Sequence, residues 1–418
     1  MSDEGHMRRS NFGHLLAIAS AALLALPIGA VAQSASKRSA SSHPGRTHIA
    51  KAHKRARCRT KHHKRQHHKR RCARAHKTTH RRFVSKSSRV LKHKNTPTQT
   101  PSKPTLTPTV PSVPAGTVQA PTLTITGTAY YVSPSGSDSN SGTSPSSAWR
   151  TVGRVNGASL RAGDGVLFEG GATFSDSTLM PSVSGAPGSP VIFGSYGQSN
   201  AVLPQGVWFK GHNYLAFEHL AIGPEGNLQG TGNGVVVEWC AVGSDGTGIN
   251  GMGSNWTIDD NTVDHTGNSG MLLEGESFTV SGNTIANTGL DPSITYGKHG
   301  IYLKVSNATV TDNTITNFSS DGISARYRNS TLADNRISNG PIGIAWFQYD
   351  PVAGTSQWTG NTIAQTTVAS IYVSPSDIGG NTRESFVIEH NTIQRAGGVY
   401  MDLHQTTGTY TALENALL

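Results

Sequence analysis

Positively charged residues are scarce after residue 127, and four of them lie close together in the sequence. That part of the chain holds 11 Lys and Arg residues against 23 Asp and Glu residues. Lys298, Lys304, Arg326 and Arg328 fall within 31 positions. Grouped cations in an anionic domain suit the binding of a carboxylate, and they also stabilise the negative charge that develops when a proton is removed beside that carboxylate. The spacing therefore indicates a site for an acidic ligand.

These residue types are the ones that β-elimination from a uronic acid requires. We expect Lys304 to take the proton from C5 of the sugar, because the charge of Arg326 beside it would favour the neutral amine. Arg326 would bind the carboxylate through two parallel hydrogen bonds. His299 or Tyr302 would give a proton to the leaving oxygen.

Further residues complete the predicted site, with tyrosines as stacking platforms for sugar rings. The predicted substrate-binding residues are Lys298, Arg328, Tyr372, Tyr400 and Asp402. Insertions at 290–296, 347–357 and 374–385 would wall a groove around them. An alternative interpretation is structural: Glu274 and Asp321 would neutralise the cations in a surface ladder.

Two interleaved repeats must position these residues. The first contains an asparagine followed by a polar and an apolar residue, and its six asparagines are separated by 22, 30, 22, 26 and 30 residues: Asn261, Asn283, Asn313, Asn335, Asn361 and Asn391. The second begins at 269, 299, 321, 342, 369 and 397, and both alternate apolar and variable residues. A step of about 22 residues with a strand period predicts a right-handed parallel β-helix, in which the asparagines stack at one corner. Lys304 would then lie one coil from Arg326, about 4.8 Å away. We expect Asp402 in the same outward column as Lys304, and Tyr302, Tyr372 and Tyr400 in the outward column beside it.

The opening of the predicted domain would cap the first coil. Residues 129–143 read as a strand and a polar loop, 149–155 as a short amphipathic helix, and a second strand starts at Val166. This segment and the asparagine repeats resemble secreted β-helix polysaccharide lyases, especially family 9 pectate lyases, over residues 127–415. The resemblance implies a carbohydrate-active protein.

The Lys304–Arg326 pair also resembles the chondroitinase B-like and alginate-lyase β-helix families, in which such a pair acts beside bound calcium. The resemblance thus implies Ca²⁺, with Glu274 and Asp321 as ligands. The Asp-Asp-Gly motif of the family 9 pectate lyases is replaced here by Asp321-Gly322 alone. We expect a lyase or an epimerase acting on a uronic-acid-containing glycan.

Two other classes of function remain open. Asp259, Asp260 and His299-Gly300 echo the motifs of polygalacturonase-type hydrolases, which place carboxylates on either side of a water. The expected coil puts the aspartates and the histidine on different faces. A non-catalytic, surface-anchored solenoid that binds or adheres to glycans is the other alternative.

The region before the domain predicts export and anchoring. Residues 1–32 are typical of a signal peptide, with Arg8 and Arg9 before an apolar run and a small-residue cleavage site. Residues 33–95 form an arm in which positions 36–95 carry 22 Lys and Arg, 10 His and no Asp or Glu, so disorder and attraction to a cell wall or another polyanion are expected. Residues 96–127 are a Thr/Pro-rich linker. A secreted or cell-surface monomer follows, and export argues against a nucleic-acid partner.

The cysteines and the end of the chain give smaller predictions. Cys240 falls in the asparagine column and should be a buried packing residue. Cys58 and Cys72 in the arm would either pair or stay free. Residues 412–418 would be a small capping helix or the end of a longer series of coils.

Overall fold

The computed structural model describes residues 123–349, 351–374, 383–395, 397–404 and 408–418. The chain divides into two units, Met1–Thr96 and Pro97–Leu418, and every described residue belongs to the second. The predicted signal peptide (1–32), basic arm (33–95) and nearly all of the linker (96–127) lie outside the described residues, as do Cys58 and Cys72. Within the described part, no helix is long and apolar enough to cross a bilayer.

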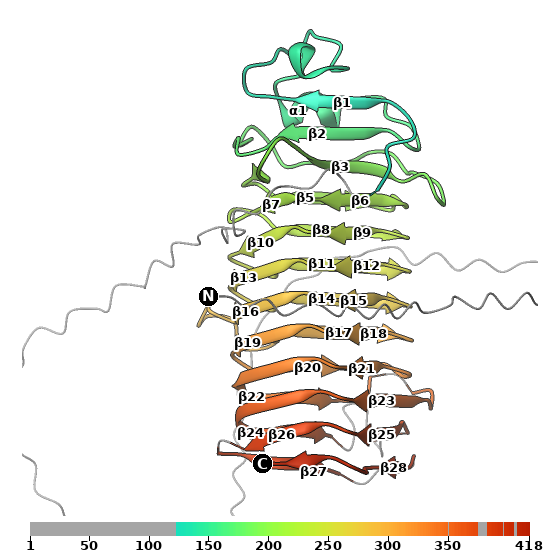
Figure 1. Cartoon of the computed structure of the whole chain (residues 1–418), viewed down its shortest axis with the longest axis vertical. Coiled ribbons are helices and arrows are strands. Elements are labelled where there is room, and N and C mark those ends of the chain that lie inside the picture. The colour runs from blue at the N-terminus through green and yellow to red at the C-terminus, as the bar shows by residue number, and fades with distance from the viewer. Residues whose placement is uncertain (1–122, 350, 375–382, 396, 405–407) are drawn as a thin grey trace, which may run out of the picture. The chain divides into compact units, whose positions relative to one another are not determined.

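The described chain winds into a stack of coils with three faces (Figure 1). The first face consists of β1 (Ala129–Val132), β2 (Gly165–Glu169), β3 (Val191–Tyr196), β6 (Leu215–Glu218), β9 (Val236–Glu238), β12 (Thr257–Asp259), β15 (Thr279–Ser281), β18 (Thr309–Thr311), β21 (Thr331–Ala333), β23 (Thr355–Thr359), β25 (Ser385–Glu389) and β28 (Tyr410–Thr411). The second face consists of β4 (Ala201–Leu203), β7 (Leu220–Ile222), β10 (Ala241–Ser244), β13 (Thr262–Thr266), β16 (Thr284–Thr288), β19 (Thr314–Phe318), the first parts of β22 (Arg336–Trp346) and β24 (Thr362–Val373), β26 (Thr392–Arg395) and β29 (Ala416–Leu417). The third, called the site face below, consists of β5 (Val207–Lys210), β8 (Leu228–Asn233), β11 (Ile249–Ser254), β14 (Met271–Glu276), β17 (Ile301–Ser306), β20 (Asp321–Ala325), the later parts of β22 and β24, and β27 (Val399–Leu403).

Neighbouring coils pair in parallel, which confirms the predicted parallel β-helix. The second repeat of the sequence forms the site face, because Met271, Ile301, Ile323, Ile344 and Ile371 pair in one column and are all fully buried. Alternation within each strand sends these apolar side chains inward and their neighbours outward. The core is continuous from Val132 in β1 to Ile393 in β26.

Asparagines hold the corner between the first and second faces, as predicted. Asn313 is fully buried, and its Nδ2 donates to Oδ1 of Asn335 and to the Val280 carbonyl, each at 3.0 Å. Its Oδ1 accepts from the backbone N–H of Asn283 at 3.0 Å. The same pattern recurs at each ladder position, so every buried amide is satisfied by its neighbours in the stack.

The corner before each asparagine needs left-handed backbone. Asp260, Asp312, Asp334 and His390 have φ between 51° and 59°, and glycines fill this position at 282 and 360. Asp and Asn tolerate this region better than most residues because their short side chains bond locally. The chain therefore turns sharply without a helix, which explains how a coil closes in about 22 residues.

The ladder begins at the predicted residue, Cys240, and extends one position beyond the predicted end, to Asn415. At the start, Cys240 takes the ladder position: its N–H donates to Asn261 Oδ1 at 2.9 Å, and burial raises the pKa of its thiol to about 12. The predicted packing role of Cys240 is confirmed. At the other end, Asn415 adds a further position, since its Oδ1 accepts from Asn391 Nδ2 at 2.9 Å. The alternative of a capping helix at 412–418 is wrong, because Asn415 continues the ladder and Ala416–Leu417 form β29.

The first coil carries the predicted short helix. α1 (Val152–Asn156) begins after Thr151, whose Oγ1 accepts from the N–H of Arg154 at 3.0 Å, and it follows the 3-10 turn η1 (Pro145–Ser147). Val152 and Val155 point into the core. In Figure 1 this helix lies at the end of the stack, between the levels of β1 and β2, and such capping segments protect the open edge of a solenoid.

Candidate functional site

The outward side chains of the site face form two columns that run the length of the stack. The first contains Trp208, Gln229, Asn250, Leu272, Tyr302, Ser324, Ala345, Tyr372 and Asp402. The second contains Lys210, Thr231, Met252, Glu274 and Lys304. Arg326 continues the second column, because it directly follows the Leu303–Ala325 pair and its N–H donates to the Leu303 carbonyl at 2.9 Å. Lys304 and Arg326 thus occupy adjacent coils, as predicted.

Both cations pack on one aromatic ring. The Lys304 Nζ lies 5.0 Å and the Arg326 guanidinium carbon 5.1 Å from the ring centroid of Tyr302. Glu274, one coil before Lys304, places Oε2 at 3.8 Å from Nζ, with 24% of the lysine side chain and 42% of the glutamate side chain exposed. A partly exposed pair at this distance contributes only ~0–1 kcal/mol. The ring of Tyr302 and the carboxylate of Glu274 together hold the two positive charges on the same patch.

Two further aromatic residues, Phe347 and Tyr349, complete this patch. Phe347 follows in the column of Arg326, and its ring centroid lies 4.4 Å from the guanidinium carbon. Tyr349 lies 5.9 Å from Lys304 Nζ, and its N–H donates to the Arg326 carbonyl at 3.0 Å. Tyr349 belongs to the 347–357 insertion, which therefore reaches the site. Most of the 374–385 insertion lies outside the described residues.

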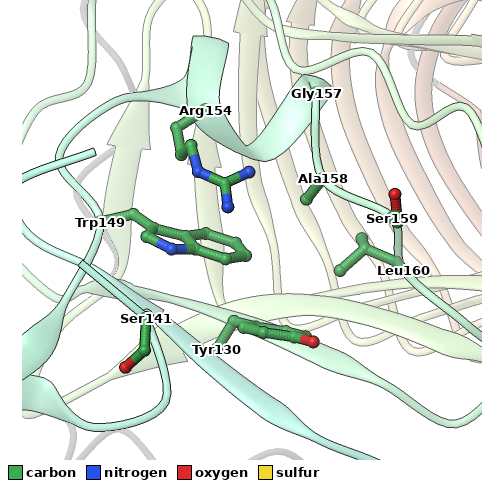
Figure 2. Close-up of a pocket in the computed structure, with 8 residues that line it drawn as sticks. All are labelled: Tyr130, Ser141, Trp149, Arg154, Gly157, Ala158, Ser159 and Leu160. Atoms are coloured by element: carbon green, nitrogen blue, oxygen red, sulfur yellow. The ribbon is translucent and has the colours of Figure 1, made fainter. Parts of the chain in front are cut away.

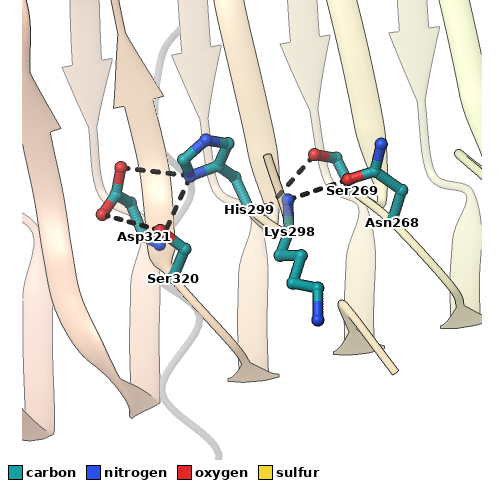
Figure 3. A network of polar contacts seen from close by, with 6 residues as sticks. All are labelled: Asn268, Ser269, Lys298, His299, Ser320 and Asp321. Atoms are coloured by element: carbon teal, nitrogen blue, oxygen red, sulfur yellow. Dashed lines mark hydrogen bonds and ion pairs between the residues drawn. The ribbon is translucent and has the colours of Figure 1, made fainter. Parts of the chain in front are cut away.

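His299 and Asp321 form a buried pair behind Tyr302. His299 Nδ1 lies 3.1 Å from Asp321 Oδ2, and the two residues are 5% and 3% exposed. The imidazole ring contacts the Tyr302 ring with centroids 4.7 Å apart. The histidine is therefore next to the predicted reaction centre, but the phenol and the lysine are the more accessible groups. Figure 3 shows this pair beside Ser320.

The other two cations are placed less directly. The backbone N–H of Lys298 donates to Asn268 Oδ1 at 2.9 Å, and its φ is 67°. In Figure 3 its side chain points away from His299 and Asp321. Arg328 follows β20, and its carbonyl accepts from the N–H of Asn307 at 3.1 Å. Both remain predicted substrate-binding residues.

Among the predicted substrate-binding residues, Tyr372 lies in the column of Tyr302 as predicted, whereas Tyr400 and Asp402 do not lie in their predicted columns. Tyr372 pairs with Asp402 in the column of Tyr302, and its ring contacts Phe347 and His404. The prediction that Tyr400 shares this column and that Asp402 shares the column of Lys304 is wrong in register. Tyr400 lies two residues earlier and donates from its hydroxyl to the Leu418 carbonyl at 3.2 Å. His404 occupies the column of Lys304 instead, because it follows Leu403, which pairs with Val373, and its N–H donates to the Val373 carbonyl at 3.1 Å.

The proposed calcium ligands do not come together. Glu274 faces Lys304, whereas Asp321 faces His299. Among the residues that the structure describes, no group of three or more His, Cys, Asp and Glu side chains is arranged to hold a metal ion. Calcium favours six to eight oxygen ligands, so these two carboxylates alone do not fit it, and no step of the chemistry is assigned to a metal.

The carboxylates considered for hydrolysis lie at a corner. Asp259 ends β12 on the first face, and its Oδ1 accepts from the Ser281 hydroxyl at 2.5 Å. Asp260 occupies the left-handed position before Asn261, and burial together with the charge of Asp259 raises its pKa. His299 lies elsewhere on the coil, just before β17 of the site face, so the aspartates and the histidine belong to different faces, as expected. His265 and Asp264 likewise form a corner pair, 2.9 Å apart.

A separate hollow of about 330 Å³ lies in the cap. Figure 2 shows Tyr130, Trp149 and Arg154 along its wall. The Arg154 guanidinium carbon is 4.3 Å from the Trp149 ring centroid, and Tyr130 stacks on Trp149 at 4.7 Å. Because Trp149 is only 2% exposed, its ring is already used in packing, and this hollow is assigned to the stability of the cap.

Comparison with known proteins agrees with the architecture. The family model "Right handed beta helix region" matches residues 247–417. Lacto-N-biosidase of Bifidobacterium longum subsp. longum is 36% identical over 90 residues, which are 21% of this chain and 6% of that protein. The crystal structure of the GH136 lacto-N-biosidase from Eubacterium ramulus aligns with a TM-score of 0.52 and 18% identity, over 69% of this chain and 67% of that one. Pectate lyase Pel9A aligns with a TM-score of 0.45 and 14% identity, over 70% and 79%.

The described domain is a right-handed parallel β-helix, and its residues 247–417 match the family model of that fold. The same fold carries different activities in different proteins, so the activity follows from the site and not from the fold.

Proposed function

We propose that the protein acts on a uronic-acid-containing glycan by β-elimination, or by epimerisation through the same first step, at the cluster of Lys304, Arg326 and Tyr302. The observation that carries this proposal is the pair of cations on one tyrosine ring, 5.0 and 5.1 Å from its centroid, on the outer surface of an otherwise anionic domain. A uronate carboxylate is the natural counterion for such a patch, because a guanidinium binds it through two parallel hydrogen bonds.

The roles follow from accessibility. Arg326 binds the carboxylate and stabilises the negative charge that spreads from C5 into it. Lys304 acts as the base in its deprotonated form: it takes the C5 proton and becomes a second cation beside that charge, and the electron pair forms the C4–C5 double bond as the C4–O bond breaks. The Tyr302 hydroxyl gives its proton to the departing oxygen. In an epimerase, a proton would instead return to C5 from the opposite side of the ring.

His299 and Asp321 have a positioning role in this scheme. They are buried and act on the reaction through the ring of Tyr302, which His299 contacts. The carboxylate orients the imidazole by holding Nδ1. Loss of His299 should therefore slow turnover by misplacing Tyr302 while leaving the binding of the carboxylate in place.

The test is incubation of the purified protein with pectate, alginate and chondroitin, with and without calcium. Elimination gives an unsaturated sugar that absorbs in the ultraviolet. Arg326→Ala should lower kcat/KM about 100-fold, as removal of charge stabilisation does in other enzymes. Tyr302→Phe keeps the ring that holds both cations but removes the acid, so it should lower kcat with little change in KM.

A matched control keeps these results interpretable. Arg336 is an exposed cation on the second face, and Arg336→Ala should leave the rate unchanged. No elimination or epimerisation product from any of the uronate glycans, or full activity in Arg326→Ala, would overturn the proposal.

Hydrolysis is the second candidate, because part of the chain is 36% identical to a lacto-N-biosidase. Glycoside hydrolases generally use two carboxylates flanking the sugar bond. In the patch, Glu274 is accessible but Asp321 is 3% exposed and bound to His299, so the geometry favours elimination. New reducing ends without ultraviolet absorbance would instead identify a hydrolase, and binding without either product would identify a glycan-binding solenoid.

We also propose that the protein is exported and held at a polyanionic surface by residues 33–95, with the linker at 96–127 as a spacer. The 22 cations without any Asp or Glu at 36–95 support this arrangement. A truncated chain starting at Thr128 should lose salt-sensitive retention on cell walls. Equal retention of the full and truncated chains would contradict the proposed anchor.

A further inference from the structure

A second hollow lies on the site face, several coils away from the proposed reaction centre. It has a volume of about 220 Å³ and is lined by Trp208, Phe209, Lys210, Gln229, Gly230, Thr231, Asn250 and Met252. Trp208 is 47% exposed and Met252 41% exposed. An indole face, two side-chain amides and an ammonium group around one hollow are the groups that recognise a sugar ring, which offers an apolar face and hydroxyls at its edge.

The hollow and the proposed active site share the same outward columns. Trp208, Gln229, Asn250, Leu272 and Tyr302 follow one another in register, one per coil. Lys210, Thr231, Met252, Glu274 and Lys304 form the neighbouring column. Four coil-to-coil steps separate Trp208 from Tyr302, which is ~19 Å at about 4.8 Å per step. No corner interrupts this path along the face.

The floor of the hollow is rigid because small residues lie over an aromatic stack. Phe209 stacks with Trp256 inside the coil, with ring centroids 5.9 Å apart. A Cβ atom at Gly230 would come within 2.1 Å of Phe209, and one at Gly251 within 2.7 Å of Trp256. Glycine is therefore required at both inward positions, and the packed rings fix the backbone that carries Gln229 and Asn250. A preformed surface binds with less loss of conformational entropy.

The charges of the two columns fit an acidic chain. Lys210 stands at the hollow and Lys304 with Arg326 at the other end, in a domain with only 11 cations. The uncharged residues Thr231 and Met252 lie between Lys210 and Glu274. A polyuronate running along the stack would meet a cation at each end of this path, which is favourable electrostatic complementarity.

We propose that this hollow is a distal binding subsite for the same glycan chain, in which one pyranose ring stacks on Trp208 while Gln229, Asn250 and Lys210 bind its hydroxyl and carboxylate groups. The inference rests on the proposed function, because it takes the chain at Tyr302 to be a uronate glycan. It adds the direction of that chain: parallel to the axis of the stack, spanning about four coils. Short oligosaccharides held at Lys304 and Arg326 do not reach Trp208, whereas polymers do.

The experiment compares Trp208→Ala with wild type on substrates of increasing length. For the polymer, KM should rise about 3- to 10-fold, the range expected for one lost aromatic contact of ~0.7–1.4 kcal/mol. For a disaccharide or trisaccharide, kcat and KM should stay unchanged. Lys210→Ala should act in the same direction and lessen the salt dependence of polymer binding. Equal polymer KM values in Trp208→Ala and wild type would overturn the subsite.

A control and a binding measurement separate this inference from the proposed reaction. Trp239 is also exposed, but it occupies a left-handed corner position with φ of 53°, so Trp239→Asn preserves the backbone and should have no effect on KM. Titration calorimetry with pectate and alginate, in the Tyr302→Phe background, measures binding without turnover. Length-dependent binding that requires Trp208, together with no product from either glycan in the wild-type protein, would retain the subsite and refute the reaction. Binding of neither glycan would refute both.

Discussion

The asparagine corner that lies in the chain between Lys304 and Arg326 provides a direct test of how the site is positioned. Asn313 is the ladder residue of this coil, and it is fully buried. In Asn313→Ala, the backbone N–H of Asn283 loses its acceptor, and the carbonyls of Val280 and Thr311 lose donors at 3.0 and 2.9 Å. The next asparagine, Asn335, loses the Nδ2 group that bonds its Oδ1.

The expected cost follows from these partners. One buried N–H left without an acceptor costs ~1–3 kcal/mol, and each lost hydrogen bond costs about 1 kcal/mol net. The free energy of unfolding should therefore fall by ~4 kcal/mol. At ~2–4 °C per kcal/mol for a domain of roughly this size, the melting temperature should drop by roughly 10 °C. Differential scanning calorimetry and circular dichroism would measure this drop.

A matched exposed amide gives the control. Asn307 also has left-handed backbone, and its Nδ2 donates to Glu276 Oε1 at 2.9 Å at the surface. Asn307→Gly removes the side chain without backbone strain and should cost less than ~1 kcal/mol. If Asn313→Ala melts at the same temperature as Asn307→Gly, the ladder amides do not hold the coil, and another cause must keep Lys304 above Arg326.

Two pH-dependent predictions follow from buried titratable groups. Burial raises the pKa of Cys240 from 9.0 to about 12. The folded state therefore keeps the thiol proton to a higher pH than the unfolded state does, and the free energy of unfolding falls as pH rises from 9.0 towards 12. Cys240→Asn, which keeps a ladder donor, should reduce this alkaline fall, measured as the urea midpoint at each pH. Burial lowers the pKa of His219 from 6.5, so its contribution is present above that value and is lost as pH falls below it. His219→Asn, which suits the φ of 53°, should lessen the loss of stability as pH falls below 6.5. An unchanged pH profile in either variant would contradict the burial of the side chain that it replaces.

The repeat made the position of the central site residues predictable. Lys304 and Arg326 are 22 residues apart, one uninterrupted coil, so their stacking follows from the period alone. Glycine marked the start of each strand on this face for a physical reason: a Cβ at Gly270 or Gly300 would come within 2.6 or 2.4 Å of an isoleucine side chain of the second face. That constraint holds in the coils from β14 to β22.

The same marker failed in the last coil. Ala369 pairs with Val399 and Ile371 pairs with Met401, so Ser370 stands opposite Tyr400. Ser370 and Tyr400 thus occupy the position of Gly270 in their coils, and neither is a glycine. An alignment of Gly398 with the earlier glycines therefore places Tyr400 and Asp402 two residues out of register. Tyr349 could not be predicted, because it lies in an insertion and no register constrains such a residue until the folded backbone is known.

The position of the two cations on Tyr302 explains why they can remain adjacent before any ligand binds. Each lies about 5 Å from the same ring centroid, so their charges are at most about 10 Å apart. At that limit the repulsion is ~0.4–1.7 kcal/mol for effective dielectric constants between about 80 and 20, and it is larger at shorter separations. Two cation–π contacts contribute ~0.5–1 kcal/mol each, which offsets the repulsion at that limit without neutralising either charge. The patch is therefore stable and still positive. A single carboxylate placed between the two groups would gain attraction from both. Tyr302→Ala should weaken the binding of that carboxylate more than Tyr302→Phe does, because only the alanine variant loses the ring that holds the cations together.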